Sequence, residues 1–220
     1  MIGPLESKRV LVTGATGNVG WGVAKAATNA GALVMLTTRS ERSAETLSTE
    51  FPAASIIVAD VATTGGSAAI SQAITTVGSL DHVVAPIGSW WQRGASLDQA
   101  PTELDSLLST YVGAQLRLTQ ITAPFLRASG GSYTLVTGAG GEHIIPGSGL
   151  LVVAVRSQFA LADVLMNELR QDSFRFNEFR IDARVEPDAR SGVVPSLTAG
   201  EAFVAVMAGD QRSELIRFTG

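Results

Sequence analysis

The sequence predicts an α/β protein with a single doubly wound, mostly parallel sheet of about seven strands flanked by helices. Three observations predict this fold. Short apolar runs alternate with helical patterns along the whole chain. A glycine-rich turn joins the first apolar run to the first helical pattern. No linker, repeat or low-complexity tract divides the chain, so residues 1–220 are expected to form one domain.

The elements follow in order from apolar periodicity, length and glycine or proline boundaries. The predicted strands are Lys8–Thr13, Ala32–Thr37, Ala54–Ala59, His82–Pro86, Ser132–Thr137, Arg175–Val185 and Glu214–Phe218. The predicted helices between them are Val19–Ala30, Ser40–Glu50, Gly66–Val77, Pro101–Ser129, Gly149–Gln171 and Thr198–Ala208. The long fourth helix is expected to break near Pro124, because proline removes a helical hydrogen bond.

The composition fits a globular protein and argues against several functional classes. Hydrophobic residues make up 45% and charged residues 16%, as in an ordered domain. The net charge of −4 argues against nucleic acid as a partner. Cysteine is absent and only two histidines occur, so no metal site is expected. Because no signal-type stretch and no run of about 18 apolar residues occurs, we expect a cytoplasmic protein without a membrane span.

The segment Val10–Gly20 has the strand–turn–helix layout of a dinucleotide phosphate site. Gly14 lets the chain turn off the strand, Gly17 lets the backbone approach a pyrophosphate, and Gly20 lets the helix pack close to the sheet. The alternative is a tight turn without a ligand. The residues predicted to bind the cofactor here are Gly14, Thr16, Gly17, Asn18, Val19 and Gly20.

The second strand ends in Thr38-Arg39, which favours NADP as the cofactor over NAD. An acidic residue at this position would bind the ribose 2′-hydroxyl of NAD, whereas an arginine suits the 2′-phosphate of NADP. The alternative is an exposed loop arginine.

Two further segments complete the predicted cofactor site. Asp60-Val61 follows the third strand, where the carboxylate can accept from the adenine amine; a helix cap or a loop aspartate is the alternative. The small residues Ala85, Pro86, Ile87 and Gly88 follow the fourth strand, where they let a cofactor lie against the strand end.

Together these features resemble the short-chain dehydrogenase/reductase family over essentially the whole chain. The glycine spacing is similar to that of extended or atypical members, because common short members place the middle glycine where this chain has Asn18. Other segments are similar to the common short form: Asp60-Val61, Leu116–Gln120, Gly130–Thr137, Asn167–Leu169 and Phe218–Gly220. The resemblance implies a Rossmann-type fold and NAD(P)-dependent reduction of carbonyls or oxidation of alcohols.

The resemblance also implies a Tyr-x-x-x-Lys pair, a serine after the fifth strand and an asparagine in the preceding helix. The corresponding positions hold Thr110 for the asparagine, Gly138 or Thr137 for the serine, Leu151 or Val152 for the tyrosine, and Val155 or Arg156 for the lysine. No Tyr-x-x-x-Lys occurs in the chain, whose only tyrosines are Tyr111 and Tyr133. A missing general acid costs about 10²–10⁴ in rate.

Candidate substitutes for the missing groups are Thr137, Glu142, His143 and Arg156. Glu142-His143 follows the fifth strand, where a histidine beside a carboxylate can exchange protons. Arg156 can replace the lysine, and Thr137 can supply a hydroxyl. The alternatives are a surface loop for the Glu-His pair, a solvent-facing helical arginine and an ordinary strand threonine.

The pair Trp90-Trp91 follows the fourth strand and is the predicted substrate pocket, because flat rings can cover a planar ligand. Packing onto the long helix or against a partner subunit is the alternative. The apolar stretch Leu150–Val155 is expected to face the core and a second subunit, which predicts a homodimer or homotetramer.

These observations leave three functions open. The first is an atypical NADP-dependent oxidoreductase acting on an unidentified small molecule. The second is a catalytically silent NADP(H)-binding sensor or scaffold, favoured by the missing Tyr, Lys and Ser. Cofactor-free chemistry like that of halohydrin dehalogenases ranks last, because Arg156 lacks the tyrosine that would accompany it.

Overall fold

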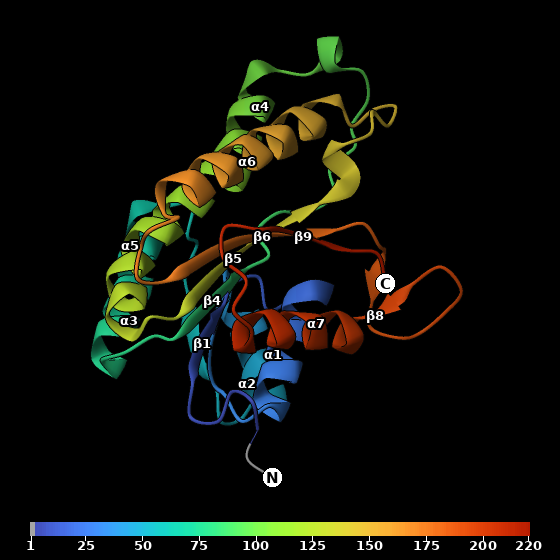
Figure 1. Ribbon diagram of the computed structural model, residues 1–220. Helices are drawn as coiled ribbons and strands as arrows, with labels where there is room; N and C mark the ends of the chain where they lie inside the picture. Colours follow the sequence, from blue (N-terminus) through green and yellow to red (C-terminus); the bar gives the residue numbers. More distant parts are fainter. Residues whose placement is uncertain (1–2) are drawn as a thin grey trace.

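The computed structural model describes residues 3–220, which form a twisted seven-stranded sheet between two layers of helices (Figure 1). The strand order is β3-β2-β1-β4-β5-β6-β9, and all neighbouring pairs are parallel. The strands are β1 (Arg9–Val12), β2 (Leu33–Thr38), β3 (Ser55–Val58), β4 (His82–Ala85), β5 (Ser132–Gly138), β6 (Arg175–Ile181) and β9 (Leu215–Phe218). This arrangement confirms the predicted fold class.

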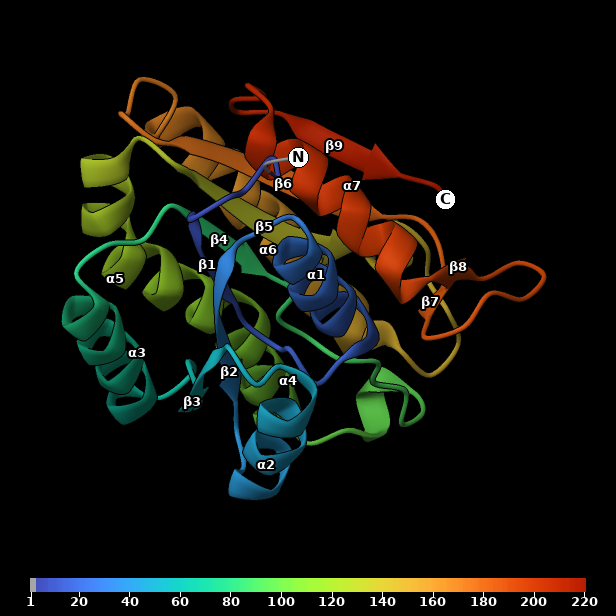
Figure 2. The ribbon, with the colours of Figure 1, turned by 90° about the horizontal axis from the view of Figure 1, so that it is seen from below.

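The helices cover both faces of the sheet (Figures 1 and 2). They are α1 (Asn18–Asn29), α2 (Glu41–Glu50), α3 (Thr64–Val77), α4 (Pro101–Leu108), α5 (Ala114–Ser129), α6 (Gly149–Glu168) and α7 (Ser196–Ala208). One layer holds α1, α2 and α7, and the other holds α3, α4, α5 and α6. Short one-turn segments lie at η1 (Ser96–Asp98), η2 (Ser109–Gly113) and η3 (Ala139–Gly141).

A separate hydrophobic core fills the space on each side of the sheet. Val10 and Leu11 are adjacent in β1 but belong to opposite cores, because successive strand side chains point to opposite faces. Phe176 and Phe179 divide between the cores in the same way in β6. The strands are therefore apolar on both faces, as expected of a parallel sheet covered on both sides.

The strand order reverses between β1 and β4, which are neighbours although β2 and β3 separate them in the sequence. The connections from β1 and β4 leave toward opposite faces, so a crevice opens beyond their carboxyl ends. Ligands of open α/β sheets bind at this position. We call it the switch-point crevice.

The structure corrects two of the predicted elements and adds a strand pair that was not predicted. The helix predicted over 101–129 is irregular at η2, which is a π-helical turn, whereas Pro124 lies inside α5. The strand predicted over 175–185 ends at Ile181. A separate pair of two-residue strands, β7 (Val185–Glu186) and β8 (Val194–Pro195), follows it.

Helix α6 has the length and composition of a membrane-spanning helix, with a mean hydropathy of 1.6, although we expected no such segment. The expectation counted uninterrupted apolar runs, whereas α6 mixes apolar residues with a few polar ones. In the fold, 44% of this stretch is buried and the helix covers one face of the sheet (Figure 1). A core helix with a second apolar face has the same composition.

Candidate functional site

The glycine loop after β1 has the geometry that its sequence predicts. Gly14 has φ +61°, and a Cβ there would lie 2.7 Å from the carbonyl oxygen of Pro86. A Cβ at Gly20 would collide with the Gly14 carbonyl oxygen. At Gly17, in contrast, a Cβ would meet only that oxygen, at 3.5 Å. Gly14 and Gly20 are thus required by packing, whereas Gly17 leaves open space.

The amino end of α1 offers unsatisfied N–H groups at the switch-point crevice. Its N-cap is Gly17, which has no side chain to accept from the first turn, and this turn contains no acidic residue. The hydroxyl of Thr13, just before the loop, is buried without a hydrogen-bond partner. A helix start of this kind attracts an anion through its free N–H groups and its dipole.

Asn18 connects the glycine loop to the segment that follows β6. Its Nδ2 donates to the carbonyl oxygen of Val185 at 2.9 Å. The neighbouring Thr16 is exposed and lines a cavity of about 220 Å³ between α1 and α2. Its other lining residues are Ala15, Trp21, Ser43, Thr46, Leu47 and Glu50.

The end of β2 carries a cation on the same side of the crevice. Thr38 is buried, and the next residue, Arg39, is exposed and forms no ion pair among residues 3–220. Ser40 then caps α2 by accepting from the backbone N–H of Ser43. The arginine side chain is therefore available to a ligand beside the glycine loop.

The two other predicted segments also lie at carboxyl strand ends. The Asp60 Oδ1 atom accepts from the N–H of Ala62 at 3.0 Å in the loop before α3, whose N-cap is Thr63, so Asp60 does not cap that helix. Val61 is buried in the core. After β4, the Pro86 carbonyl oxygen lies against Gly14, and Gly88 has φ +140°.

A third apolar cluster lies beyond the crevice, between the chain after β4 and the helices. Its buried members are Trp91, Leu107, Tyr111, Leu151, Ala154 and Val155. The indole N–H of Trp91 is buried without an acceptor. Trp90 is 59% exposed. Of the two tryptophans, one therefore packs onto the helices, as the alternative expected, and one stays at the surface.

A network of charged side chains crosses the carboxyl ends of β5, β6 and β9. Thr137 donates to the buried carboxylate of Glu178 at 2.5 Å, and Arg180 donates to the same oxygen at 2.7 and 2.9 Å. Arg180 also pairs with Glu142 at 2.7 Å, and Arg217 pairs with Glu142. Hydrogen bonds from Arg217 and then Arg180 lower the pKa of Glu142 to about 2.

This network changes how the substitute residues can act. Glu142 is ionised at neutral pH and cannot serve as an acid there, because both arginines favour its charged form. Thr137 is buried and turned toward Glu178. Arg156 donates through Nε to the Gly141 carbonyl oxygen at 2.8 Å. Only His143 is exposed and without a hydrogen bond among the residues that the structure describes.

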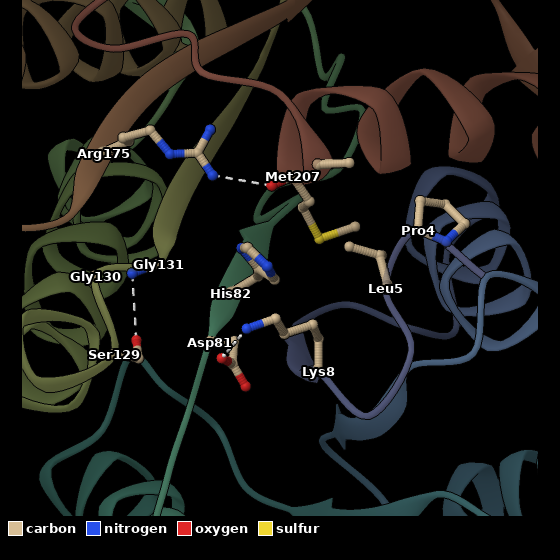
Figure 3. A pocket seen from close by; sticks show the side chains of 11 residues that line it. Pro4, Leu5, Lys8, Asp81, His82, Ser129, Gly130, Gly131, Arg175 and Met207 are labelled. Carbon is tan, nitrogen blue, oxygen red and sulfur yellow. Dashed lines mark hydrogen bonds and ion pairs between the residues drawn. The ribbon is translucent and has the colours of Figure 1, made fainter. Parts of the chain in front are cut away.

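A different cavity, of about 230 Å³, lies at the opposite, amino edge of the sheet (Figure 3). Lys8 pairs with Asp81 there at 3.1 Å. Arg175 donates to the carbonyl oxygens of Met207, at 2.9 Å, and Gly209 at the carboxyl end of α7. Helix carboxyl ends attract cations. These charged side chains therefore stabilise the fold. The cavity lies at the opposite edge of the sheet from the predicted cofactor residues.

The comparisons with known proteins agree with this geometry. A family model described as Enoyl-(Acyl carrier protein) reductase matches residues 14–179, which is well over half of the chain. The chain belongs to the short-chain dehydrogenase/reductase family. A comparison with curated protein sequences finds no match.

Solved structures of family members share the fold across nearly the whole chain. One is a short-chain dehydrogenase from Mycobacterium smegmatis, with TM-score 0.85 and 22% identity, covering 99% of this chain and 94% of that one. Another is the NADH-dependent enoyl-[acyl-carrier-protein] reductase from Aquifex aeolicus, with TM-score 0.84 and 18% identity, covering 98% and 96%. A third is L-sorbose reductase from Gluconobacter frateurii, complexed with NADPH and L-sorbose, with TM-score 0.84 and 17% identity, covering 99% and 97%.

Several positions at which the sequence resemblance places catalytic residues are buried apolar residues or lack a side chain. Leu151 and Val155 are buried in the third cluster, and Gly138 carries no side chain. Thr110 lies within the π-helical turn η2, a feature that is frequent at functional sites. The only lysines of the chain are Lys8 and Lys25, near its start.

Sequence reasoning missed how Tyr111 and Gln115 act. Tyr111 packs in the third cluster, and its hydroxyl also binds the backbone of Ser89 in the chain after β4. Burial raises the pKa of Tyr111, so its phenol stays protonated. Gln115 is fully buried on α5 and binds the Ala85 carbonyl. The sequence did contain a clue to this hydrogen bond, because a glutamine within an apolar helix face needs a buried partner.

Proposed function

We propose that this protein binds NADP(H) along the switch-point crevice. The observation that carries the proposal is the uncapped amino end of α1 beneath Gly17, at the point where the strand order reverses. The amides of Asn18, Val19 and Gly20 would hold the pyrophosphate. Arg39 would pair with the 2′-phosphate.

The remaining cofactor contacts follow the carboxyl edge of the sheet. The free oxygen of Asp60 would accept from the adenine amine, beside Val61. The small residues from Ala85 to Gly88 would form the opposite wall. The residues fit a dinucleotide, because Gly17 leaves the space that a pyrophosphate needs and Thr13 has an unpartnered hydroxyl beneath it.

We propose that the activity is oxidoreduction without the family's tyrosine–lysine relay. A bound nicotinamide cofactor supplies or accepts the hydride. The Tyr111 phenol of the third cluster is already bound to the Ser89 backbone, so the small-molecule substrate would take its proton from water or from the exposed His143. Flat, conjugated acceptors suit this requirement, and the exposed Trp90 can cover them.

The second candidate is a catalytically silent NADP(H)-binding sensor or scaffold. The packing of Trp91 against Leu151 and Val155 favours it, because an apolar cluster then occupies the positions of the proton relay. A panel of carbonyl and quinone acceptors with NADPH separates the two functions. NADPH consumption that falls in a His143→Ala variant supports the enzyme, whereas NADPH binding without consumption supports the sensor.

The cofactor preference has its own test in Arg39→Ala. The loss of a charge-assisted contact should weaken NADPH binding about tenfold or more and leave NADH binding within about twofold. An equal loss for both cofactors would refute the 2′-phosphate role. Arg42→Ala, one turn away on α2 and exposed, serves as the control for the loss of one surface charge.

We also propose that the protein is a homodimer or homotetramer. Val153 and Val164 on α6 are 46% and 51% exposed. They lie 11 residues apart, which is about three helical turns, so they share one face of the helix. Leu116 on the neighbouring α5 is exposed as well. An apolar stripe of this kind suits an interface between two copies of the chain.

A further inference from the structure

The chain that follows β4, residues 85–89, is held from the helix side by buried amide groups. The Nε2 of Gln115 donates to the Ala85 carbonyl oxygen at 2.8 Å, and its Oε1 accepts from the Tyr133 hydroxyl at 3.0 Å. Gln115 is fully buried, so this amide has two fixed partners. A second glutamine, Gln158 on α6, donates to the Ile87 carbonyl oxygen at 3.5 Å.

Tyr111 holds the end of the same segment. Its hydroxyl accepts from the backbone N–H of Ser89 at 2.7 Å and donates to the carbonyl oxygen of the same residue. Its ring packs against Gly88, where a Cβ would lie 2.5 Å from the ring carbon Cε1. Gly88 therefore cannot be replaced without moving the tyrosine.

The three side chains bind alternate carbonyl groups, those of Ala85, Ile87 and Ser89. Between them, the chain bends at Pro86 through a hydrogen bond from the Ile87 N–H to the Ala85 carbonyl at 2.9 Å. A loop is usually free to change conformation. This one has a fixed contact at every second residue.

The opposite side of residues 85–89 faces the switch-point crevice. The Pro86 carbonyl oxygen lies against Gly14, so residues 85–89 and the glycine loop adjoin at the switch point. The helix-side contacts leave the crevice side of the wall free for a ligand.

We propose that Tyr111, Gln115 and Gln158 are positioning residues that fix residues 85–89 as one wall of the cofactor site. The inference rests on the proposed NADP(H) binding. A wall that is already ordered loses little conformational entropy when the ligand binds, which raises affinity without any added contact. None of the three residues takes part in a chemical step.

The test measures NADPH dissociation constants for Tyr111→Phe, Gln115→Leu and Gln158→Leu at a temperature well below unfolding. We expect about fivefold or greater weakening for the first two, from the loss of one or two net hydrogen bonds. A smaller effect is expected for Gln158→Leu, whose bond is the longest. Thr122→Val is the control, because Thr122 is equally buried on α5 and bonds only within its own helix.

Hydrogen exchange provides a readout that a merely destabilising substitution does not move. In Tyr111→Phe the Ser89 amide loses its acceptor, so exchange should accelerate at the amides of residues 87–89 and stay unchanged in β4. Thr122→Val should lower the melting temperature, but it should change neither NADPH affinity nor the hydrogen exchange of the chain after β4.

The outcomes separate the two proposals. If the wild-type protein does not bind NADPH, the proposed function fails. If it binds NADPH and the folded Tyr111→Phe variant binds within about twofold of it, the positioning role is overturned. Should Gln115→Leu fail to fold, Tyr111→Phe alone decides the question, because it removes a single hydroxyl and keeps the ring.

Discussion

At the residue scale, the burial of His82 determines the charge state of its imidazole. It is 5% exposed in β4, and its Nδ1 lies 2.9 Å from the Ser132 hydroxyl. Burial lowers the pKa of His82 to about 4; Asp81 opposes this shift, whereas the positive charges of Arg175 and Lys8 add to it (Figure 3). The folded protein therefore keeps this imidazole neutral at pH values where an unfolded chain would protonate it.

The free energy of unfolding should consequently fall as the pH is lowered, because the unfolded chain binds a proton at His82 more readily than the folded chain. The pKa is lower in the folded than in the unfolded chain, so stability is full above about pH 6.5 and decreases down to about pH 4. The expected loss in the free energy of unfolding is about 3 kcal/mol. Urea unfolding at pH 7 and pH 4 measures it. In a His82→Gln variant the loss should be smaller by this amount, and equal losses in the two proteins would contradict the account.

At the element scale, the glycine loop and α1 contain one glycine that packing requires, Gly20, and one that leaves space for the proposed ligand, Gly17. The collision of a Gly20 Cβ with the Gly14 carbonyl oxygen means that the loop or helix must move in Gly20→Ala. Position 17 has the space and, with φ −88°, the backbone conformation that alanine accepts.

Two alanine variants should therefore have opposite effects. Gly20→Ala should lower the free energy of unfolding by about 1–3 kcal/mol, as overpacked sites do. Gly17→Ala should change it by less than about 0.5 kcal/mol but weaken NADPH binding, because its methyl group enters the space proposed for the pyrophosphate. Chemical unfolding and NADPH titration of both proteins measure the pair. Intact NADPH affinity in Gly17→Ala would place the pyrophosphate elsewhere.

Periodicity predicted most elements well, because helices and strands of this fold are long enough to show a pattern. It failed where structure depends on contacts from distant segments. Pro124 is accepted inside α5, while the irregular turn occurs at η2, where Tyr111 reaches the chain after β4. The two-residue strands β7 and β8 are too short for any pattern.

The positions of the glycine loop and of the segments at the strand ends were also readable from the sequence, because glycine spacing and strand ends are local features. The ion pairs of Glu142 were not, since Arg180 and Arg217 lie far along the chain on other strands. For the same reason the sequence could not decide which of the two tryptophans would be buried.

At the scale of the whole molecule, the two edges of the sheet differ in what their positive groups contact. The carboxyl edge carries the uncapped end of α1 and the exposed Arg39, whereas at the amino edge Arg175 binds the carboxyl end of α7. The proposed ligand binding and this contact within the fold therefore lie at opposite edges of the same sheet. Helix α6, which carries the exposed Val153 and Val164, lies in the layer with α3, α4 and α5 (Figure 1), and we propose that a second copy packs on it.

The proposed oligomer should dissociate when charge is placed at these two valines. A Val153→Glu/Val164→Glu double variant would place two carboxylates in an apolar interface, where desolvation is costly. Sedimentation analysis should give a smaller particle than for the wild type. Two glutamates on α3, Thr75→Glu/Thr76→Glu, serve as the control for added surface charge. A monomeric wild-type protein, or a double variant with unchanged mass, would contradict the interface.

The most direct test of the central claim is a calorimetric titration of the wild-type protein with NADPH and, in parallel, NADH. The account predicts saturable binding of NADPH, about tenfold or more tighter than that of NADH, because only NADPH offers a 2′-phosphate to Arg39. No binding of either cofactor up to about 1 mM would contradict it.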